Sequence, residues 1–316
     1  MKNIKNQIIV ISGYPASGKS TLTKQLVADG YMNFNRDNLK CSLLELNEKI
    51  TNIIKAGQDK IVLDNTYATV SSRAPLVNIA KKFKYNIELW EMGTSFEDAQ
   101  FNAIQRQIER TGKLMQPEDF KLATDPNLFP PAVIYVYKKE YQPPSMFEGF
   151  DMIRKIKFER KYPTDFNNKA VIFDYDGTLR ETISGKKFPT SPDDIKILPG
   201  RTEKLKKLVD TGYLLLGLSN QSGIAKGDLS YDTAKECFEY TNQLLGFDID
   251  VQFCSHSVPP IICYCRKPSP GYGVHFIQKY KLNPNLVTVV GDMTSDKTFA
   301  KRCGFRYVDQ KDFFTI

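Results

Sequence analysis

The sequence predicts an α/β protein made of two consecutive domains, each built around a parallel sheet. Three observations support this fold class. Apolar runs of strand length alternate with amphipathic segments, and the alternation starts afresh near the middle of the chain. The 316 residues exceed what one hydrophobic core usually organises, so two domains of about 150 residues are expected. Hydrophobic residues make up 41% of the chain, enough to offset the entropy cost of folding.

The first series of elements predicts a parallel sheet covered by helices. Strands are expected at 7–12, 60–64 and 86–92, with another ending near Asn35. Helices are expected to begin near Lys19, Leu39, Ser71 and Phe96. Because each strand is followed by a helical segment, neighbouring strands should run in the same direction.

The second series begins after a stretch typical of a domain boundary. Residues 129–168 carry two Pro-Pro pairs, at 130–131 and 143–144, and a basic run, RKIKFERKYPTDFNN. We place the seam near residues 160–168, which gives domains at 1–162 and 163–316. The strands expected beyond it are 169–174, 213–219, 248–254 and 286–292.

Charge and composition limit the function classes. A formal net charge of +8 favours anionic ligands such as nucleotides or nucleic acid, although a generally basic solvated surface is the alternative. The N-terminal apolar run is short and has no cleavage site, and no stretch approaches the roughly 20 apolar residues that span a bilayer. We therefore expect a cytoplasmic protein, or a nuclear one in a eukaryote, that is not secreted and has no membrane partner.

A phosphate-binding motif follows the first strand. Gly13-Tyr-Pro-Ala-Ser-Gly18-Lys19-Ser20 fits G-x-x-x-x-G-K-[ST] between a strand and a helix. The backbone amides of such a loop wrap the phosphates of ATP, the lysine reaches the outer phosphates and the serine hydroxyl can hold Mg²⁺. The residues assigned to the nucleotide and its metal are Gly13, Ser17, Gly18, Lys19, Ser20 and Thr21.

Two further features fit a kinase. Asp37, 18 residues after Lys19, lies where it could accept the proton of an attacking hydroxyl, although Asp37 also suits the cap of the next helix. Arg106 and Arg110 lie one helical turn apart and could neutralise the transferred phosphoryl group, with a solvated helix face as the alternative.

Residues 8 to about 160 resemble the kinase domain of polynucleotide kinase/phosphatases of phage and animals. The shared order is GYPASGKST, NFNRDNLK, IVLDNTYATVSSR, FEDAQFNAIQRQIERTGK and VYKKEYQPPSMFEGF. The resemblance implies that Asp37 is the general base and that Arg106 and Arg110 are lid arginines. It also implies that Asp64, Asn65 and Arg73 lie beside the acceptor or the metal, and that Lys40 stands where the phage enzymes carry an arginine that holds the acceptor phosphate. We assign Arg36 to the acceptor as well.

The second domain opens with a pair of carboxylates. Asp174-Tyr-Asp176-Gly-Thr ends a predicted strand, and a phosphatase of this kind needs one carboxylate to attack phosphorus and another to protonate the leaving oxygen and later activate water. Residues i and i+2 of a strand share a face. A calcium loop begins similarly, but here no glutamate follows at the required spacing and the preceding run is a strand.

Later elements repeat the motif order of the haloacid dehalogenase superfamily, which residues 169–309 resemble. These are Ser219 before Asn220-Gln-Ser-Gly, Lys267 in CRKPSPG, and Asp292 after a strand. The resemblance implies a Rossmann-like domain with Asp174 as nucleophile and Asp176 as acid/base. By the same resemblance, Ser219 and Lys267 would bind the phosphate, and Asp174 and Asp292 would hold Mg²⁺. We further assign Asn220 and Arg266 to the substrate and Asp176 to the metal. Because no large insertion separates the motifs, the cap domain should be minimal or absent.

A cluster of soft ligands suggests zinc. Cys254-x-His256 and, after six residues, Cys263-x-Cys265 supply one imidazole and three thiolates, a set suited to a closed tetrahedral Zn²⁺ site. Buried reduced cysteines are the alternative. The pattern is similar to that of histidinol-phosphate and heptose-bisphosphate phosphatases, which act on small molecules.

These features predict a bifunctional enzyme that phosphorylates 5′-hydroxyl ends and removes 3′-phosphates from DNA or RNA, with a ligase as a candidate partner. A small-molecule kinase fused to a sugar- or polyol-phosphate phosphatase is the second hypothesis, favoured by the zinc motif. A nucleotide-binding scaffold without catalysis is the third. The sequence does not decide between DNA and RNA or give the oligomeric state.

Overall fold

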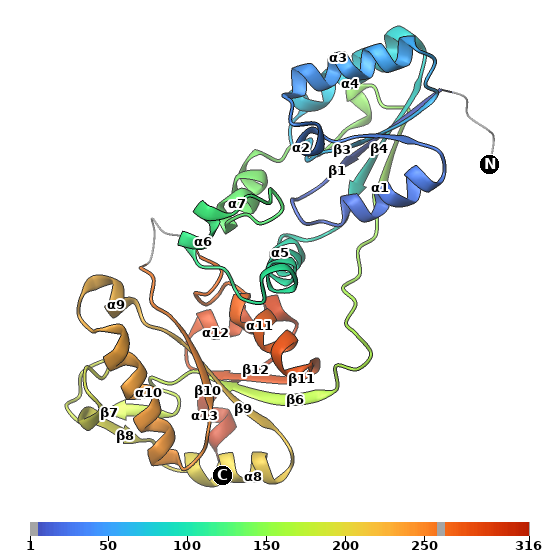
Figure 1. Ribbon diagram of the computed structural model, residues 1–316. Helices are drawn as coiled ribbons and strands as arrows, with labels where there is room; N and C mark the ends of the chain where they lie inside the picture. The colour runs from blue at the N-terminus through green and yellow to red at the C-terminus, as the bar shows by residue number, and fades with distance from the viewer. Residues whose placement is uncertain (1–5, 258–262, 316) are drawn as a thin grey trace. The chain divides into compact units, whose positions relative to one another are not determined.

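A computed structural model describes residues 6–257 and 263–315 of the chain (Figure 1). The chain divides into two compact units. The first comprises Met1–Ala103 with Asp125–Arg160, and the second comprises Ile104–Thr124 with Lys161–Ile316. None of the helices in the described ranges has the length and apolar character that crossing a bilayer would require.

The first unit is built on a five-stranded parallel sheet in the order β2-β3-β1-β4-β5. Its strands are β1 Gln7–Ser12, β2 Met32–Phe34, β3 Lys60–Asp64, β4 Asn86–Met92 and β5 Met152–Ile156. All six residues of β1 are buried, as expected of a central strand covered on both faces. The sheet predicted from the sequence is confirmed, and β5 adds a strand from the stretch interpreted as a domain boundary.

Helices cover both faces of this sheet. α1 Lys19–Ala28 covers one face, and α3 Leu43–Lys55 and α4 Val70–Phe83 cover the other. The same part of the chain also forms α2 Arg36–Leu39, α5 Phe96–Thr111 and α7 Pro131–Glu140, with a 3₁₀ turn η1 at Met146–Glu148. Ile8 and Val10 of β1 pack with α3 and α4, whereas Ile9 and Ile11 pack with α1. Figure 1 shows α3 and α4 on one side of the strands and α1 on the other. The alternating apolar residues of one strand therefore hold two helical layers.

The helix expected to begin near Leu39 was placed wrongly. α2 ends at Leu39, and the long helix α3 begins at Leu43. Ser42 caps α3: Glu45 N donates to Ser42 Oγ at 3.2 Å, and Ser42 N donates to Glu45 Oε2 at 2.7 Å. This reciprocal capping box satisfies amides that would otherwise lack partners, so the helix starts at that position.

The second unit contains another parallel sheet, in the order β10-β9-β6-β11-β12. Its strands are β6 Asn168–Phe173, β9 Leu214–Asn220, β10 Asp250–Cys254, β11 Leu282–Gly291 and β12 Arg306–Asp309. Its helical elements are α6 Pro117–Leu122, η2 Pro192–Asp194, α8 Arg201–Asp210, α9 Ser222–Lys226, α10 Tyr231–Leu245, α11 Gly271–Tyr280, α12 Thr294–Cys303 and α13 Gln310–Phe314. A small antiparallel hairpin, β7 Arg180–Thr182 with β8 Ile195–Ile197, takes the place of a cap domain.

The topology brings three predicted motifs together. β6 lies between β9 and β11, and all three strands run parallel. Asp174 follows β6, Ser219 and Asn220 end β9, and Asp292 follows β11. In an open parallel sheet, ligands bind at the carboxyl ends of adjacent strands. The strand order thus places these residues at one edge of the sheet.

Candidate active sites

The loop after β1 has the backbone of a phosphate cradle. Gly13, Ala16 and Gly18 have φ angles of 155°, 62° and 92°. A Cβ at residue 13 would lie 2.7 Å from Cβ of Met92, so glycine is required there by space as well as by conformation. The loop leads directly into α1, whose first-turn amides favour an anion.

Side chains from the region after β4 fix the cradle. Thr94 Oγ1 donates to the carbonyl oxygen of Ser17 at 2.8 Å, and Asn102 Nδ2 donates to that of Ala16 at 2.9 Å. The Ser17 hydroxyl is buried and has no hydrogen-bond partner among the described residues. The loop is therefore preorganised and retains an unused polar group, which fits a bound phosphate.

Lys19 folds back over the loop. Its ammonium donates to the carbonyl oxygens of Gly13 at 3.0 Å and Tyr14 at 2.8 Å, and only 9% of the residue is exposed. Ser20 and Thr21, in the first turn of α1, are exposed. A cation held at this loop can bind the outer phosphates of a nucleotide, so these residues fit ATP.

The ends of β2 and β3 meet beside this loop in the sheet. Asn35 caps α2 by accepting from the amides of Asp37 at 2.9 Å and Asn38 at 3.0 Å, and its side chain donates to the carbonyl oxygen of Asp64. Arg36 N donates to Asn65 Oδ1 at 3.0 Å. The cap of α2 is thus Asn35, and the alternative role of Asp37 as the cap is wrong.

Asp37 itself is open to solvent, with 60% of its side chain exposed. The Arg36 guanidinium lies 3.9 Å from it. Lys40 ends α2 in a left-handed conformation with φ of 47°, and Asp64 is buried. The structure therefore groups Arg36, Asp37 and Asp64 at adjoining strand ends, with Asp37 free to contact a solvent-borne acceptor.

Arg73 is placed differently from what the resemblance implied. Its guanidinium is fully buried, donates to Glu148 through Nε at 2.7 Å and Nη2 at 2.8 Å, and donates through Nη1 to the carbonyl oxygens of Tyr67 and Gln142. It fastens η1 to the start of α4. In this arrangement Arg73 supports the acceptor side of the sheet and presents no group to a substrate.

The two lid arginines share one face of α5. Arg106 and Arg110 lie four residues apart on this helix. They fall in Ile104–Thr124, which groups with the second compact unit, whereas the P-loop belongs to the first. Their approach to a nucleotide consequently stays a prediction.

In the second unit, Lys267 forms the centre of a buried charge cluster. Its ammonium donates to Asp174 Oδ1 at 2.6 Å and to the carbonyl oxygen of Leu218 at 2.7 Å, and it lies 2.7 Å from Asp296 Oδ1. Only 5% of Lys267 and 1% of Asp296 are exposed. Lys267 thus links Asp174, which follows β6, to Asp296 in the first turn of α12.

Burial and neighbouring charges shift the pKa values of this cluster. Burial raises the pKa of Asp174 to about 7; Lys267 opposes the rise and the charge of Asp296 adds to it. Burial lowers the pKa of Lys267, but the charges of Asp174 and Asp296 outweigh it and the net shift is upward. Lys267 therefore stays cationic, and a further cation beside Asp174 would favour its ionised form.

Asp176 points to a different set of partners. Arg180 Nε donates to its Oδ1 at 2.8 Å, and Gln221 Nε2 donates to its Oδ2 at 3.1 Å. The Gln221 amide also lies 2.9 Å from Ser219 Oγ. Both carboxylate oxygens of Asp176 accept hydrogen bonds, which fixes the plane of its carboxylate beside Ser219.

Two residues hold the Lys267 loop. Asn220 Nδ2 donates to the carbonyl oxygen of Lys267 at 3.0 Å, and Lys267 N donates to Asn220 Oδ1 at 3.0 Å. Arg266 Nη1 donates to the carbonyl oxygen of His256 at 3.3 Å. Asn220 and Arg266 therefore act on the loop that carries Lys267, besides any contact with a phosphate.

Three carboxylates converge at this edge of the sheet. Asp174, Asp292 and Asp296 offer oxygens within 4.8 Å of one another. Lys267 pairs with both Asp174 and Asp296. Asp296 is almost completely buried, whereas Asp292 is exposed and Asp174 is 9% exposed, so Asp174 and Asp292 are the more accessible pair. Carboxylate oxygens suit Mg²⁺. The predicted third ligand, Asp176, is absent from this set because Arg180 and Gln221 engage its side chain.

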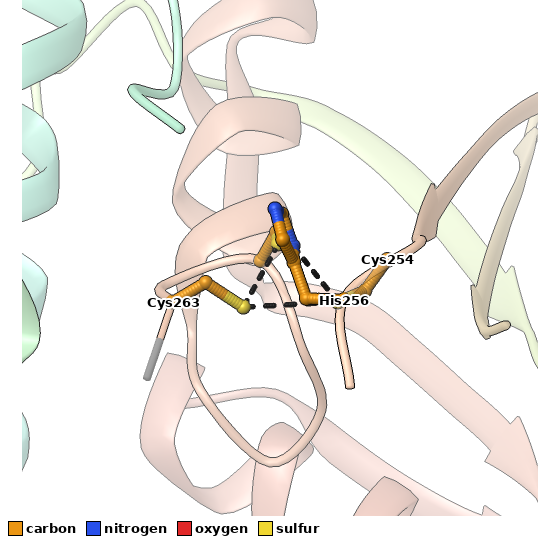
Figure 2. Close-up of side chains that lie close together, drawn as sticks. Cys254, His256 and Cys263 are labelled. Carbon is orange, nitrogen blue, oxygen red and sulfur yellow. Dashed lines mark hydrogen bonds between the residues drawn. The ribbon is translucent and has the colours of Figure 1, made fainter. Parts of the chain in front are cut away.

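The predicted zinc ligands lie together (Figure 2). Cys254 Sγ is 3.7 Å from Cys263 Sγ and 3.5 Å from His256 Nδ1, while Cys265 Sγ is 3.1 Å from Cys263 Sγ and 3.2 Å from His256 Nδ1. Sulfur and nitrogen ligands of one tetrahedral zinc ion are separated by about 3.5–3.8 Å. The two separations from Cys254 Sγ match this range, and the two from Cys265 Sγ are shorter than it. Figure 2 shows the labelled side chains pointing toward one another. The four residues fit a shared metal.

Sequence reasoning assigned no role to three residues of the second site. Arg180 and Gln221 hold Asp176, and Asp296 holds Lys267. Each lies close in sequence to a recognised motif: Arg180 is four residues after Asp176, Gln221 follows Asn220, and Asp296 is four after Asp292. Their closeness in sequence to the motifs was the one signal that could have identified these residues. It did not show which partners their side chains contact.

Comparison with known proteins now identifies the second domain. A family model described as polynucleotide kinase 3 phosphatase matches residues 169–314. A D-glycero-beta-D-manno-heptose-1,7-bisphosphate 7-phosphatase of Pasteurella multocida is 33% identical over 142 residues, which are 42% of this chain and 76% of that relative. This chain belongs to the haloacid dehalogenase-type phosphatases. The resemblance inferred from the motif order is confirmed.

This haloacid dehalogenase-type phosphatase also has bifunctional relatives. A bifunctional polynucleotide phosphatase/kinase of Schizosaccharomyces pombe is 30% identical over 159 residues, which are 50% of this chain but only 35% of that relative. A solved Pnkp1/Rnl/Hen1 complex aligns with 98% of this chain and 99% of its own chain, at 16% identity and a TM-score of 0.33. The chain therefore combines a P-loop motif in its first unit with a phosphatase domain of this family in its second.

Proposed function

We propose that this protein heals nucleic-acid ends: the first domain transfers the γ-phosphoryl group of ATP to a 5′-hydroxyl, and the second removes a 3′-phosphate. One observation carries the proposal. A single chain contains both the Lys19 cradle and the Asp174–Lys267 site, and the latter lies in a match to polynucleotide 3′-phosphatases. Ligation needs a 5′-phosphate and a 3′-hydroxyl, and these two reactions produce them. A ligase is accordingly the partner we propose.

In the phosphatase reaction, Asp174 attacks phosphorus and the bond to the leaving 3′-oxygen breaks. Asp176 gives that oxygen a proton and then takes one from the water that hydrolyses the aspartyl-phosphate. Lys267 lies 2.6 Å from Asp174, where its charge balances the phosphate oxygens, and Ser219 donates to them. Mg²⁺ held by Asp174 and Asp292 would supply further charge neutralisation.

In the kinase reaction, the amides of residues 13–18 and the Lys19 ammonium hold the phosphates of ATP. Asp37 takes the proton of the 5′-hydroxyl, whose oxygen attacks the γ-phosphorus as ADP leaves. The Ser20 hydroxyl would hold Mg²⁺, which would supply further charge neutralisation at the phosphates. Arg36 stands beside Asp37 and offers a cation to the acceptor strand.

The hairpin that replaces a cap suits a polymeric substrate. The loop between β7 and β8 exposes Ile183 and Phe188, and the ammonium of Lys187 lies 5.3 Å from the Phe188 ring centroid. Exposed aromatic rings flanked by lysines are typical of surfaces that stack bases of single-stranded nucleic acid. We propose that this loop binds the nucleic-acid strand that ends in the 3′-phosphate.

An oligonucleotide with a 5′-hydroxyl and a 3′-phosphate tests both reactions in one tube. With γ-labelled ATP we expect label at the 5′ end and inorganic phosphate from the 3′ end, and DNA and RNA versions define the preference. The second candidate function is hydrolysis of small sugar phosphates, favoured by the 33% identity to a heptose-bisphosphate phosphatase. Turnover of heptose 1,7-bisphosphate with no change at either oligonucleotide end would refute the nucleic-acid proposal.

We propose that Cys254, His256, Cys263 and Cys265 hold a structural zinc ion. Because Cys265 precedes Lys267 by two residues, the ion stabilises the loop that carries the catalytic lysine. Cys265→Ser should abolish the bound zinc, about one per chain in the wild type by elemental mass spectrometry. It should lower the melting temperature of the phosphatase domain by roughly 10 °C.

Cys41→Ser is the matched control, because Cys41 lies in the other domain and outside the cluster. That variant should keep both the zinc and the melting temperature. A wild-type protein purified without chelators that contains no zinc would instead favour buried reduced cysteines at this position.

A further inference from the structure

Arg180 is a buried cation for which the mechanism above has no role. It begins β7, four residues after Asp176, and only 1% of the residue is exposed. Its Nε donates to Asp176 Oδ1 at 2.8 Å. A buried guanidinium is costly to desolvate, so its position against one of the two motif carboxylates calls for a function.

Helix α10 holds this guanidinium from behind. Arg180 Nη1 donates to the carbonyl oxygen of Cys237 at 2.8 Å and to Thr241 Oγ1 at 2.8 Å. The Arg180 side chain also lies over two aromatic rings, with its Cζ 4.7 Å from the Phe238 centroid and 5.4 Å from that of Tyr175. Hydrogen bonds and cation–π contacts thus lock the guanidinium in one orientation.

The locked guanidinium in turn orients Asp176. Arg180 holds one carboxylate oxygen, and Gln221 holds the other while also contacting Ser219. A carboxyl group that must protonate a leaving oxygen has to lie within hydrogen-bond reach of it and in the right plane. Two donors from different elements, β7 and the end of β9, fix that plane before substrate arrives.

We infer that Arg180 is a positioning residue that transmits the rigidity of α10 to the acid/base Asp176. The inference rests on the proposed role of Asp176. Without Arg180, the carboxyl group would rotate about its side-chain bonds, and the proton transfer to the leaving oxygen would lose efficiency. Attack by Asp174, which pairs with Lys267 instead, would be affected far less.

The dependence of the rate on the leaving group separates a loss of proton transfer by Asp176 from a loss of nucleophilic attack by Asp174. Phenyl phosphate has a poor leaving group that needs a proton, whereas 2,4-dinitrophenyl phosphate releases a stable anion without one. For Arg180→Met we expect kcat/KM to fall about 100-fold with phenyl phosphate and less than about fivefold with 2,4-dinitrophenyl phosphate. The kcat/KM value is informative because it reports only the steps up to cleavage of the ester bond.

Two further variants keep the test decisive if Arg180→Met folds poorly. Arg180→Lys retains a cation but cannot bridge Asp176 and α10, so we expect about a tenfold loss confined to phenyl phosphate. Lys196→Gln removes the ion pair with Glu181 on the same hairpin and should leave both substrates unaffected. Equal losses with both substrates, or no loss, would overturn the positioning role.

Asp176→Asn shows which proposal has failed. If it discriminates between the two substrates while the Arg180 variants do not, Asp176 is the acid and only the role of Arg180 is wrong. If Asp176→Asn hydrolyses both substrates at the wild-type rate, the assigned chemistry of Asp176 falls, and the inference about Arg180 falls with it.

Discussion

Replacing Asp174 with asparagine is expected to reduce phosphatase activity by a thousandfold or more, because an amide cannot form the aspartyl-phosphate, and such losses are typical for a nucleophile (about 10³-fold or greater). The measurement is release of inorganic phosphate from p-nitrophenyl phosphate and from a 3′-phosphorylated oligonucleotide. Kinase activity of the same protein should persist, since the P-loop lies in the other compact unit.

A matched control for this variant is Asp165→Asn. Asp165 also pairs with a lysine, Lys281 at 2.8 Å, but both side chains are about 60% exposed, so this pair contributes little. The control should hydrolyse both substrates normally. Phosphatase activity of Asp174→Asn within tenfold of the wild type would rule out the covalent mechanism.

For Lys19→Ala we expect the kinase activity to fall and the phosphatase activity to persist. Removing the ammonium that lies inside the P-loop should lower kinase turnover by about 10²–10³-fold, the usual cost of losing one preorganised charge at a transferred phosphoryl group. Phosphate release by the second domain should be unchanged. Transfer of label from ATP to a 5′-hydroxyl oligonucleotide measures the first effect, and the phosphatase assay measures the second.

Lys24→Ala is the control for a simple charge effect. Lys24 lies on α1, one turn after the P-loop, and is exposed. Its replacement should leave label transfer nearly unaltered. If Lys19→Ala keeps more than about a third of wild-type kinase turnover, the loop does not act as the nucleotide site, and the kinase assignment has to be abandoned.

Local patterns predicted the parts of each site that lie on one segment. The run 7–12 became β1, and the glycines of the P-loop adopt the positive φ angles that the motif requires. The strand that precedes Asp174 was predicted from its apolar run in the same way, and so was the strand that precedes Asp292. These features depend on periodicity and on backbone geometry, which a single sequence displays.

Long-range contacts could not be predicted in this way. Arg73 is bound to Glu148, 75 residues away, and is buried where the resemblance implied substrate contact. Arg180 meets α10 about 60 residues further along the chain. Polar residues that satisfy one another inside a domain look the same in the sequence as polar residues that face solvent. Only the packed structure separates the two.

The two hydrogen bonds between Asn220 and the backbone of Lys267 affect how the phosphatase would lose activity when a chelator is added. These hydrogen bonds hold Lys267 from β9 independently of the cysteine cluster. Removal of the proposed zinc ion at low temperature should therefore leave the position of Lys267 unchanged. Damage would appear on warming, when the loop on the cysteine side begins to open. Inactivation by chelators should thus be slow, heat-assisted and, at first, reversible.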